Sequence, residues 1–129
     1  MAKRILIVDD SPELRELYKE VLEGEGYEVA CAGNGREALE FLGASPLKPD
    51  LILLDIFMHV MDAREFRQHQ LAAKTTAEIP VVIMSVDGRA KVAAEKLSAK
   101  DFYSKTTGIF GLIDVVNRHC ADLQKIGRK

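Results

Sequence analysis

The sequence is poor in the residues that build disulfide-linked, metal–thiolate and membrane proteins. It has only two cysteines, Cys31 and Cys120, which lie far apart in the chain and match no metal-binding or redox spacing. No stretch is long and apolar enough to span a bilayer. The first residues lead directly into a predicted strand, with no signal peptide before it. We therefore expect a cytoplasmic protein in which both thiols are reduced.

An excess of charge of one sign is also missing. The formal net charge is −2, so we expect no binding of nucleic acid or of an anionic membrane by this domain. The 129 residues are 47% hydrophobic and 29% charged, which suits a single domain, 1–129, with a sizeable core. The basic segment 125–129 is interpreted as a frayed helix end or the start of a linker.

Apolar runs and helical patterns alternate five times along the chain. Strands are predicted at 4–8, 27–31, 51–55, 81–84 and 101–103. Helices are predicted to follow them at about 12–24, 35–43, 62–74, 89–97 and 109–123. This alternation indicates an α/β fold, a parallel sheet with helices on both faces. Of the two common doubly wound orders, five strands fit the flavodoxin-like (βα)5 sandwich with strand order 2-1-3-4-5.

Acidic residues end two of the predicted strands. Asp9 and Asp10 follow the first strand, and Asp55 closes the third. The predicted order makes these strands neighbours, so the three carboxylates should meet at the carboxyl edge of the sheet. Like charges this close need a cation, and oxygen ligands favour Mg²⁺. Alternatively, Asp9 and Asp10 form only a turn and a helix cap, which explains less well why both strands end in acid.

The fourth and fifth strands bring two further polar residues to the same edge. Ser85 ends the fourth strand, and Lys105 follows the fifth. Taken alone, Ser85 reads as a turn former and Lys105 as a solvated loop lysine. Their position beside the acids is what indicates a site.

Together these residues resemble the receiver domain of two-component response regulators. The segment from Asp55 to Ala63, DIFMHVMDA, is similar to the phosphoacceptor signature of that family. The resemblance covers essentially the whole chain. It rests on five sites in the right order, which are Asp9, Asp10, Asp55, Ser85 and Lys105.

The resemblance implies a role for each residue. Asp55 would accept a phosphoryl group, and Ser85 and Lys105 would contact it. Phe102 occupies the position of the family's switch aromatic, which acts together with Ser85. The implied Mg²⁺ ligands are Asp9, Asp10, Asp55 and the backbone carbonyl of Phe57.

The implied function is a phosphorylation-controlled signalling switch in a two-component phosphorelay. A histidine kinase or phosphotransfer protein would supply the phosphoryl group, and a downstream protein partner would respond to the switch. The chain is not expected to be an enzyme beyond weak self-catalysed phosphotransfer and autodephosphorylation. We expect the phosphorylated state to be long-lived, because Phe57, two residues after Asp55, cannot orient the water that hydrolyses it. Asp87, two residues after Ser85, is the remaining polar side chain that could hold such a water.

Three other functions compete with this one. A receiver-like scaffold could bind a partner without phosphorylation. A phosphatase of the haloacid-dehalogenase type would need a second acid two residues after Asp55, where Phe57 stands. A flavin or dinucleotide binder would need a glycine-rich phosphate loop after the first strand, where Asp9 and Asp10 stand instead.

Four loop positions depart from the family pattern. His59 and Thr106 replace prolines, and Ala63 and Ser98 replace glycines. None is a predicted site residue, so these changes bear on loop geometry and partner choice. A proline after the lysine commonly makes a cis bond in the family, and with Thr106 that bond would cost about 2.5–4 kcal/mol. We therefore predict a trans Lys105–Thr106 bond.

Overall fold

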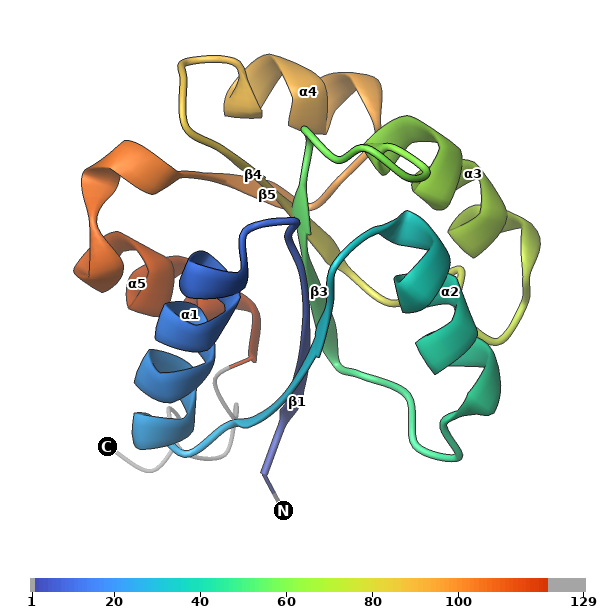
Figure 1. The fold of residues 1–129 in the computed structure, drawn as a ribbon, viewed down its shortest axis with the longest axis horizontal. Helices are drawn as coiled ribbons and strands as arrows, with labels where there is room; N and C mark the ends of the chain where they lie inside the picture. The colour runs from blue at the N-terminus through green and yellow to red at the C-terminus, as the bar shows by residue number, and fades with distance from the viewer. Residues whose placement is uncertain (1, 121–129) are drawn as a thin grey trace.

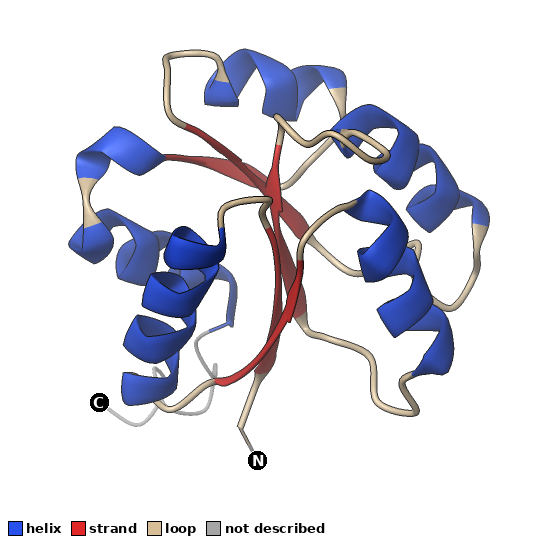
Figure 2. Cartoon of the chain, viewed as in Figure 1, coloured by secondary structure: helices blue, strands red, loops and turns tan. Residues whose placement is uncertain are grey.

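The computed structural model describes residues 2–120 (Figures 1 and 2). The predicted end of the last helix at Leu123 and the basic segment 125–129 lie outside the described residues. The strands are β1 (Arg4–Val8), β2 (Glu28–Ala32), β3 (Leu51–Asp55), β4 (Val81–Ser85) and β5 (Asp101–Ser104). The helices are α1 (Pro12–Gly24), α2 (Gly35–Ala44), α3 (Ala63–Ala72), α4 (Ala90–Lys96) and α5 (Ile109–Cys120), with a 3₁₀ turn, η1 (Lys105–Thr107), before α5.

The strands form one parallel sheet in the order β2-β1-β3-β4-β5, which confirms the predicted fold. Helices α1 and α5 cover one face of the sheet, and α2, α3 and α4 cover the other (Figure 1). This is the layering that right-handed crossovers between parallel strands produce. Within residues 2–120, no helix has the length and apolar character needed to cross a membrane.

Some element bounds differ from the predicted ones by a residue or two. Strand β2 begins at Glu28, because the N–H of Tyr27 is used to bind the carbonyl of Leu22 at the end of α1. Helix α3 ends at Ala72, because the Thr76 hydroxyl donates to the carbonyl of Gln70 and closes a turn there. Both changes come from local hydrogen bonds that hydrophobic periodicity does not report.

Polar caps fix where three helices begin. The side chains of Ser11, Asn34 and Asp62 accept the backbone N–H three residues on, at 3.2, 2.9 and 2.9 Å. Each bond satisfies one of the four N–H groups that a helix start leaves free. These caps set the short loops that follow β1, β2 and β3, and two of those loops border the site.

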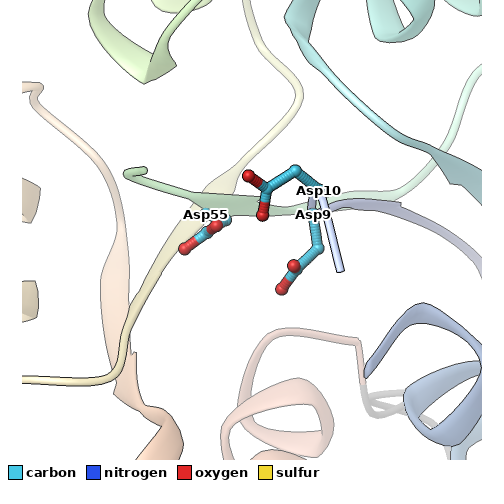
Figure 3. A group of neighbouring side chains, drawn as sticks. All are labelled: Asp9, Asp10 and Asp55. Atoms are coloured by element: carbon cyan, nitrogen blue, oxygen red, sulfur yellow. The ribbon is translucent and has the colours of Figure 1, made fainter. Parts of the chain in front are cut away.

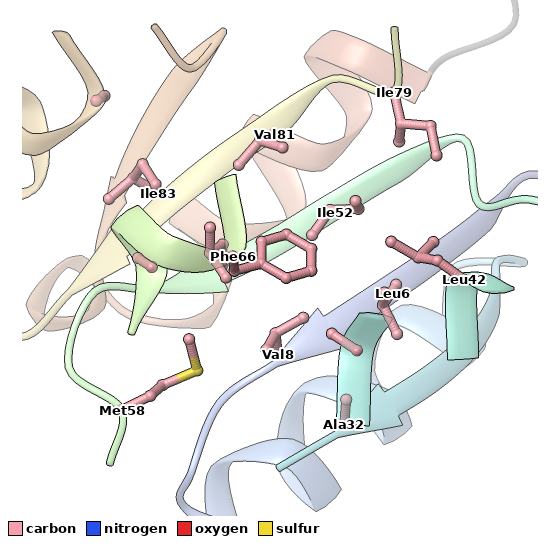
Figure 4. Close-up of a cluster of buried hydrophobic side chains, with 14 residues drawn as sticks. Leu6, Val8, Ala32, Leu42, Ile52, Met58, Phe66, Ile79, Val81 and Ile83 are labelled. Atoms are coloured by element: carbon pink, nitrogen blue, oxygen red, sulfur yellow. The ribbon is translucent and has the colours of Figure 1, made fainter. Parts of the chain in front are cut away.

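Two apolar clusters lie on opposite faces of the sheet. Successive strand residues point to opposite faces, so each central strand contributes to both clusters. On the side of α2 and α3, buried strand residues such as Leu6, Ile52 and Ile83 surround the ring of Phe66 (Figure 4). All residues of β3 and β4 are buried. Polar side chains of these strands are therefore concentrated at their carboxyl ends.

Candidate functional site

Three carboxylates converge at the carboxyl ends of β1 and β3 (Figure 3). The register pairs Val8 with Leu54, so the residues that follow them, Asp9 and Asp55, come level at the edge of the sheet. Together with Asp10 they offer carboxylate oxygens that all lie within 4.8 Å of one another. Asp9 is 0% and Asp55 4% exposed, whereas Asp10 faces solvent. The predicted acid cluster is thus present, with two of its members buried.

Lys105 supplies a positive charge to this cluster. Its Nζ lies 2.6 Å from Oδ2 of Asp9 and 3.4 Å from Oδ1 of Asp55. The resemblance implied contact with Asp55 or the phosphoryl group, and the closer partner is instead Asp9. Burial explains this preference, because Asp9 is the most enclosed of the three acids and an unpaired charge there would be costly. Lys105 therefore sits between the two buried carboxylates.

The electrostatics of Asp55 follow from its burial. Loss of solvation raises the pKa of Asp55 to about 6, the attraction of Lys105 opposes the rise, and the charge of Asp9 adds to it. Near neutral pH the carboxyl group remains largely ionised. Asp55 can therefore act as a nucleophile while it is held between a like charge and an opposite one.

A chain of polar contacts begins at Ser85, the last residue of β4. Its hydroxyl donates to Oδ1 of Asp87 at 2.7 Å, and Oδ2 of Asp87 accepts from Nε of Arg89 at 2.8 Å. The Arg89 guanidinium lies over the ring of Phe57, 4.5 Å from its centroid. Phe57 therefore packs under Arg89 at the edge of the site, and the two loops after β3 and β4 are joined.

Arg89 was missed by sequence reasoning, and so was the close packing of Gly35. A Cβ on Gly35 would lie 2.5 Å from the carbonyl oxygen of Met61, so only glycine lets α2 approach the loop after β3 this closely. Met61 itself has a φ of 57°. Neither feature has a sequence signal, because both depend on contacts between segments far apart in the chain.

A groove of about 400 Å³ opens beside the acids. Its walls come from the loops after β1 and β3, and it is lined by Asp10, Ile56, Phe57, Met58, His59 and Asp62. The exposed imidazole of His59 stands 3.9 Å from Oδ2 of Asp10 at its rim. The groove leads from solvent to the carboxylates.

The remaining predicted positions lie at or beyond the rim of the site. Phe102 is 39% exposed on β5 and stands opposite Ile83 in β4 rather than beside the acids. The Lys105–Thr106 bond is trans, as are all peptide bonds of residues 2–120, which confirms that prediction. Ala63 is buried at the start of α3, and Ser98 adopts a φ of 57° after α4.

The donor set fits a hard divalent cation. The three carboxylates supply oxygen ligands only. Such a set, in a groove open to water, suits Mg²⁺, which keeps part of its hydration shell. The single ammonium of Lys105 pairs with two of the three carboxylates, so a bound dication would improve the charge balance of the cluster.

Comparison with known proteins identifies the family. The response regulator receiver domain family matches residues 5–117. The chain is 36% identical to response regulator GtcR of Aneurinibacillus migulanus over 97% of this chain and 49% of that protein, so it spans about half the length of GtcR. It is 35% identical to chemotaxis protein CheY of Thermotoga maritima over 92% of this chain and 98% of that protein.

A solved structure agrees with these relatives. Response regulator TrrA of Thermotoga maritima, in complex with Mg²⁺ and BeF, superimposes with a TM-score of 0.78 at 31% identity, covering 90% of this chain and 97% of that one. Members of the family are phosphorylation switches rather than classical enzymes, bind Mg²⁺ at the acidic pocket and interact with histidine kinases or phosphotransfer proteins. By sequence and by fold, this chain belongs to the response regulator receiver domain family.

Proposed function

We propose that the whole chain, 1–129, is one receiver domain that works as a phosphorylation-controlled switch. Asp55 accepts a phosphoryl group from a phosphohistidine of a histidine kinase or phosphotransfer protein, and Mg²⁺ is required. The observation that carries this proposal is the convergence of Asp9, Asp10 and Asp55 within 4.8 Å, with Lys105 between the two buried acids. A cytoplasmic location and a downstream protein partner belong to the same proposal.

Asp55 is the nucleophile. One of its carboxylate oxygens attacks phosphorus, and the bond from phosphorus to the donor nitrogen breaks as the new P–O bond forms. A pKa of about 6 keeps Asp55 ionised at neutral pH, so no separate base is needed. Positioning and neutralisation of the phosphoryl oxygens supply the rest of the catalysis.

Three other side chains complete the acceptor site. The Lys105 ammonium, 3.4 Å from Asp55, is placed to offset charge on the phosphoryl group. The Ser85 hydroxyl ends the neighbouring strand and is the donor that would reach a phosphoryl oxygen. Phe102 is proposed to change its environment together with Ser85, since both lie on the α4 side of adjacent strands.

The residues that would hold Mg²⁺ are Asp9, Asp10, Asp55 and the backbone carbonyl of Phe57. When bound, Mg²⁺ neutralises the carboxylates and the incoming phosphoryl oxygens. Asp10 is the most accessible of these carboxylates, and Asp9 is the most enclosed. An anionic donor would otherwise meet three carboxylates, of which the Lys105 ammonium pairs with Asp9 and Asp55.

The test is incubation with acetyl phosphate, with and without Mg²⁺, followed by intact-mass measurement. The expected result is a mass increase of one phosphoryl group that depends on Mg²⁺ and disappears in Asp55→Asn. Asp114→Asn, an exposed aspartate on α5, is the matched control and should be labelled as the native chain is. Labelling that survives Asp55→Asn would refute the assignment.

A further inference from the structure

Helix α4 is held at its N-terminal end by contacts that start inside the site. The Ser85 hydroxyl donates to Oδ1 of Asp87, and the N–H of Asp87 returns a 3.2 Å bond to Oγ of Ser85. Oδ1 of Asp87 also accepts the backbone N–H of Arg89 at 3.0 Å, and Nη2 of Arg89 lies 2.6 Å from Oδ2. Asp87 is thus held by both Ser85 and Arg89, the residue that directly precedes α4.

The same contacts continue to the opposite wall of the site. The Arg89 guanidinium stacks on Phe57, which stands two residues after Asp55. Ser85 is fully buried, whereas Phe57 is 45% exposed. The chain of contacts therefore runs from the buried hydroxyl to the surface, across the loops after β4 and β3. An exposed ion pair stacked on an aromatic ring is a weak bond that can open and close.

We propose that Asp87, Arg89 and Phe57 form a latch that keeps the Ser85 hydroxyl turned away from Asp55, and that the latch must open for Asp55 to be phosphorylated. The reason is stoichiometric. A serine hydroxyl has one hydrogen to donate, so Ser85 can donate to Asp87 or to a phosphoryl oxygen, but not to both. Asp87 and Arg89 are positioning residues in this scheme, acting through Ser85. This inference rests on the proposed function of Asp55.

The other end of α4 is fixed in a different way. Nε and Nη2 of the buried Arg67 donate to the carbonyls of Leu97 and Ser98, at 2.9 and 2.6 Å. These bonds join the end of α4 to α3 and do not involve the site. Opening of the latch would therefore free the N-terminal end of α4, while Arg67 holds the C-terminal end as a pivot.

The latch and simple charge repulsion predict different changes in the rate of Asp55 phosphorylation, and for Arg89→Ala the changes are opposite in sign. If Asp87 only repelled an anionic donor, Asp87→Ala and Asp87→Asn would speed phosphorylation equally, and loss of the Arg89 cation would slow it. If the latch operates, Asp87→Asn retains an acceptor for Ser85 and stays nearer the native rate. Arg89→Ala then speeds the reaction, because an untethered Asp87 carboxylate holds the hydroxyl less well.

The experiment measures the initial rate of Asp55 phosphorylation by acetyl phosphate with Mg²⁺, at low and high salt, by intact mass. The variants are Asp87→Ala, Asp87→Asn, Arg89→Ala and the double variant Asp87→Ala/Arg89→Ala. Glu95→Ala and Lys91→Ala, exposed residues of α4, are the charge-matched controls. Loss of one competing hydrogen bond should raise the rate in Asp87→Ala about three- to tenfold. The double variant should match Asp87→Ala, because Arg89 acts only through Asp87.

A second measurement examines the latch without phosphorylation. Side-chain NMR signals of Arg89 should be displaced by the Phe57 ring and should move toward ordinary values in Phe57→Leu. Arg89→Ala, a change at an exposed side chain, carries the test if Asp87→Ala does not fold.

The outcomes separate the two proposals. Absence of Asp55 labelling in every variant would overturn the proposed function, and the latch with it. Labelling of the native chain with an unchanged rate in Asp87→Ala, or a slower rate in Arg89→Ala, would overturn the latch alone. Equal increases in the phosphorylation rate of Asp87→Ala and Asp87→Asn that vanish at high salt would also overturn the latch alone, because they would show that Asp87 acts only by its charge.

Discussion

Charge is buried in two parts of the described chain, and the two differ in how that charge is satisfied. In the acid crevice, Asp9 and Asp55 are 0% and 4% exposed and share the single ammonium of Lys105. Between α3 and the end of α4, Arg67 is 8% exposed and has neutral partners. Burial shifts both pKa values toward the neutral form, raising that of Asp55 and lowering that of Arg67.

The Arg67 region is complete without any ligand. Its guanidinium donates to the side-chain oxygen of Gln70 at 2.7 Å as well as to the two carbonyls at the end of α4. The Gln70 amide donates in turn to the carbonyls of Thr76 and Ile79, at 2.9 and 3.0 Å. The buried donors and acceptors here are thus paired within the protein, as a structural network requires.

The acid crevice is not complete in this sense. Asp9, Asp10 and Asp55 bring three carboxylates to one place, and Lys105 offsets only part of their charge. The excess is what gives the crevice affinity for a cation and for chemistry at Asp55. A buried charge whose hydrogen bonds are all made within the protein, such as that of Arg67, therefore indicates a structural role. A buried cluster whose charge is only partly balanced, such as the three acids, indicates a functional site.

The largest expected effect is the loss of Arg67. Arg67→Ala should lower the free energy of unfolding by about 2–4 kcal/mol, because the buried Gln70 side-chain oxygen and the partly buried carbonyls of Leu97 and Ser98 lose their donor. Urea unfolding of the native chain and of Arg67→Ala measures this change in the free energy of unfolding. Arg64→Ala, an exposed arginine of the same helix, is the control and should change stability by less than about 0.5 kcal/mol. Equal losses in the two variants would show that the network adds nothing.

The next effect is the pH dependence that Asp55 causes when no metal is bound. Its pKa is raised from 3.8 to about 6, so the folded state binds a proton more tightly than the unfolded state. The resulting stabilisation is fully present below about pH 4 and is lost as pH rises through about 6, with a span of up to about 3 kcal/mol. Unfolding at a series of pH values in chelator should show this loss.

Asp55→Asn supplies the control for that pH dependence. The amide does not titrate, so the difference in unfolding free energy between the native chain and this variant should change between pH 4 and pH 7, in favour of the variant at high pH. A difference that stays constant with pH would mean that the burial of Asp55 costs less than its pKa indicates.

Repulsion among the three carboxylates should also lower the stability of the metal-free chain at Asp10. Asp10→Asn, and more so Asp10→Lys, should raise the melting temperature in chelator, by the equivalent of roughly 0.5–1 kcal/mol, and should abolish phosphorylation. The gain is smaller than for Asp55 because Asp10 faces solvent. Glu40→Gln, an exposed acid on α2, controls for loss of a negative charge. A fall in melting temperature in both Asp10 variants would contradict repulsion within the crevice.

The sequence was sufficient for the parts of the molecule that depend on periodicity and on strand ends. Buried runs followed by Asp9, Asp55 and Ser85 predict both the sheet order and the convergence of the acids, since parallel strands share one carboxyl edge. Caps at Asn34 and Asp62 were readable because each bond spans only three residues.

The parts that could not be predicted depend on contacts between distant segments. Arg67 finds its acceptors thirty residues away, and Arg89 finds Phe57 across two loops. The preference of Lys105 for Asp9 over Asp55 depends on which acid is more enclosed, and no spacing in the sequence encodes that. Contacts of this kind can be identified only when the three-dimensional positions of the side chains are known.

An effect as small as that of Asp10 is predicted for Ser98, at the end of α4 that Arg67 holds. Ser98 has a φ of 57°, and the bonds from Ala99 N–H to the Ala94 carbonyl and from Ser98 N–H to the Glu95 carbonyl, at 2.9 and 3.3 Å, close the helix in the way that usually calls for glycine there. Ser98→Gly should therefore raise the free energy of unfolding by about 0.5–1 kcal/mol, because a Cβ is strained in this conformation. Ser98→Ala keeps the Cβ and should show no such gain. Because this end of α4 lies away from the acids, Ser98→Gly should leave the rate of Asp55 phosphorylation unchanged, and a changed rate would mean that the two ends of the helix are coupled.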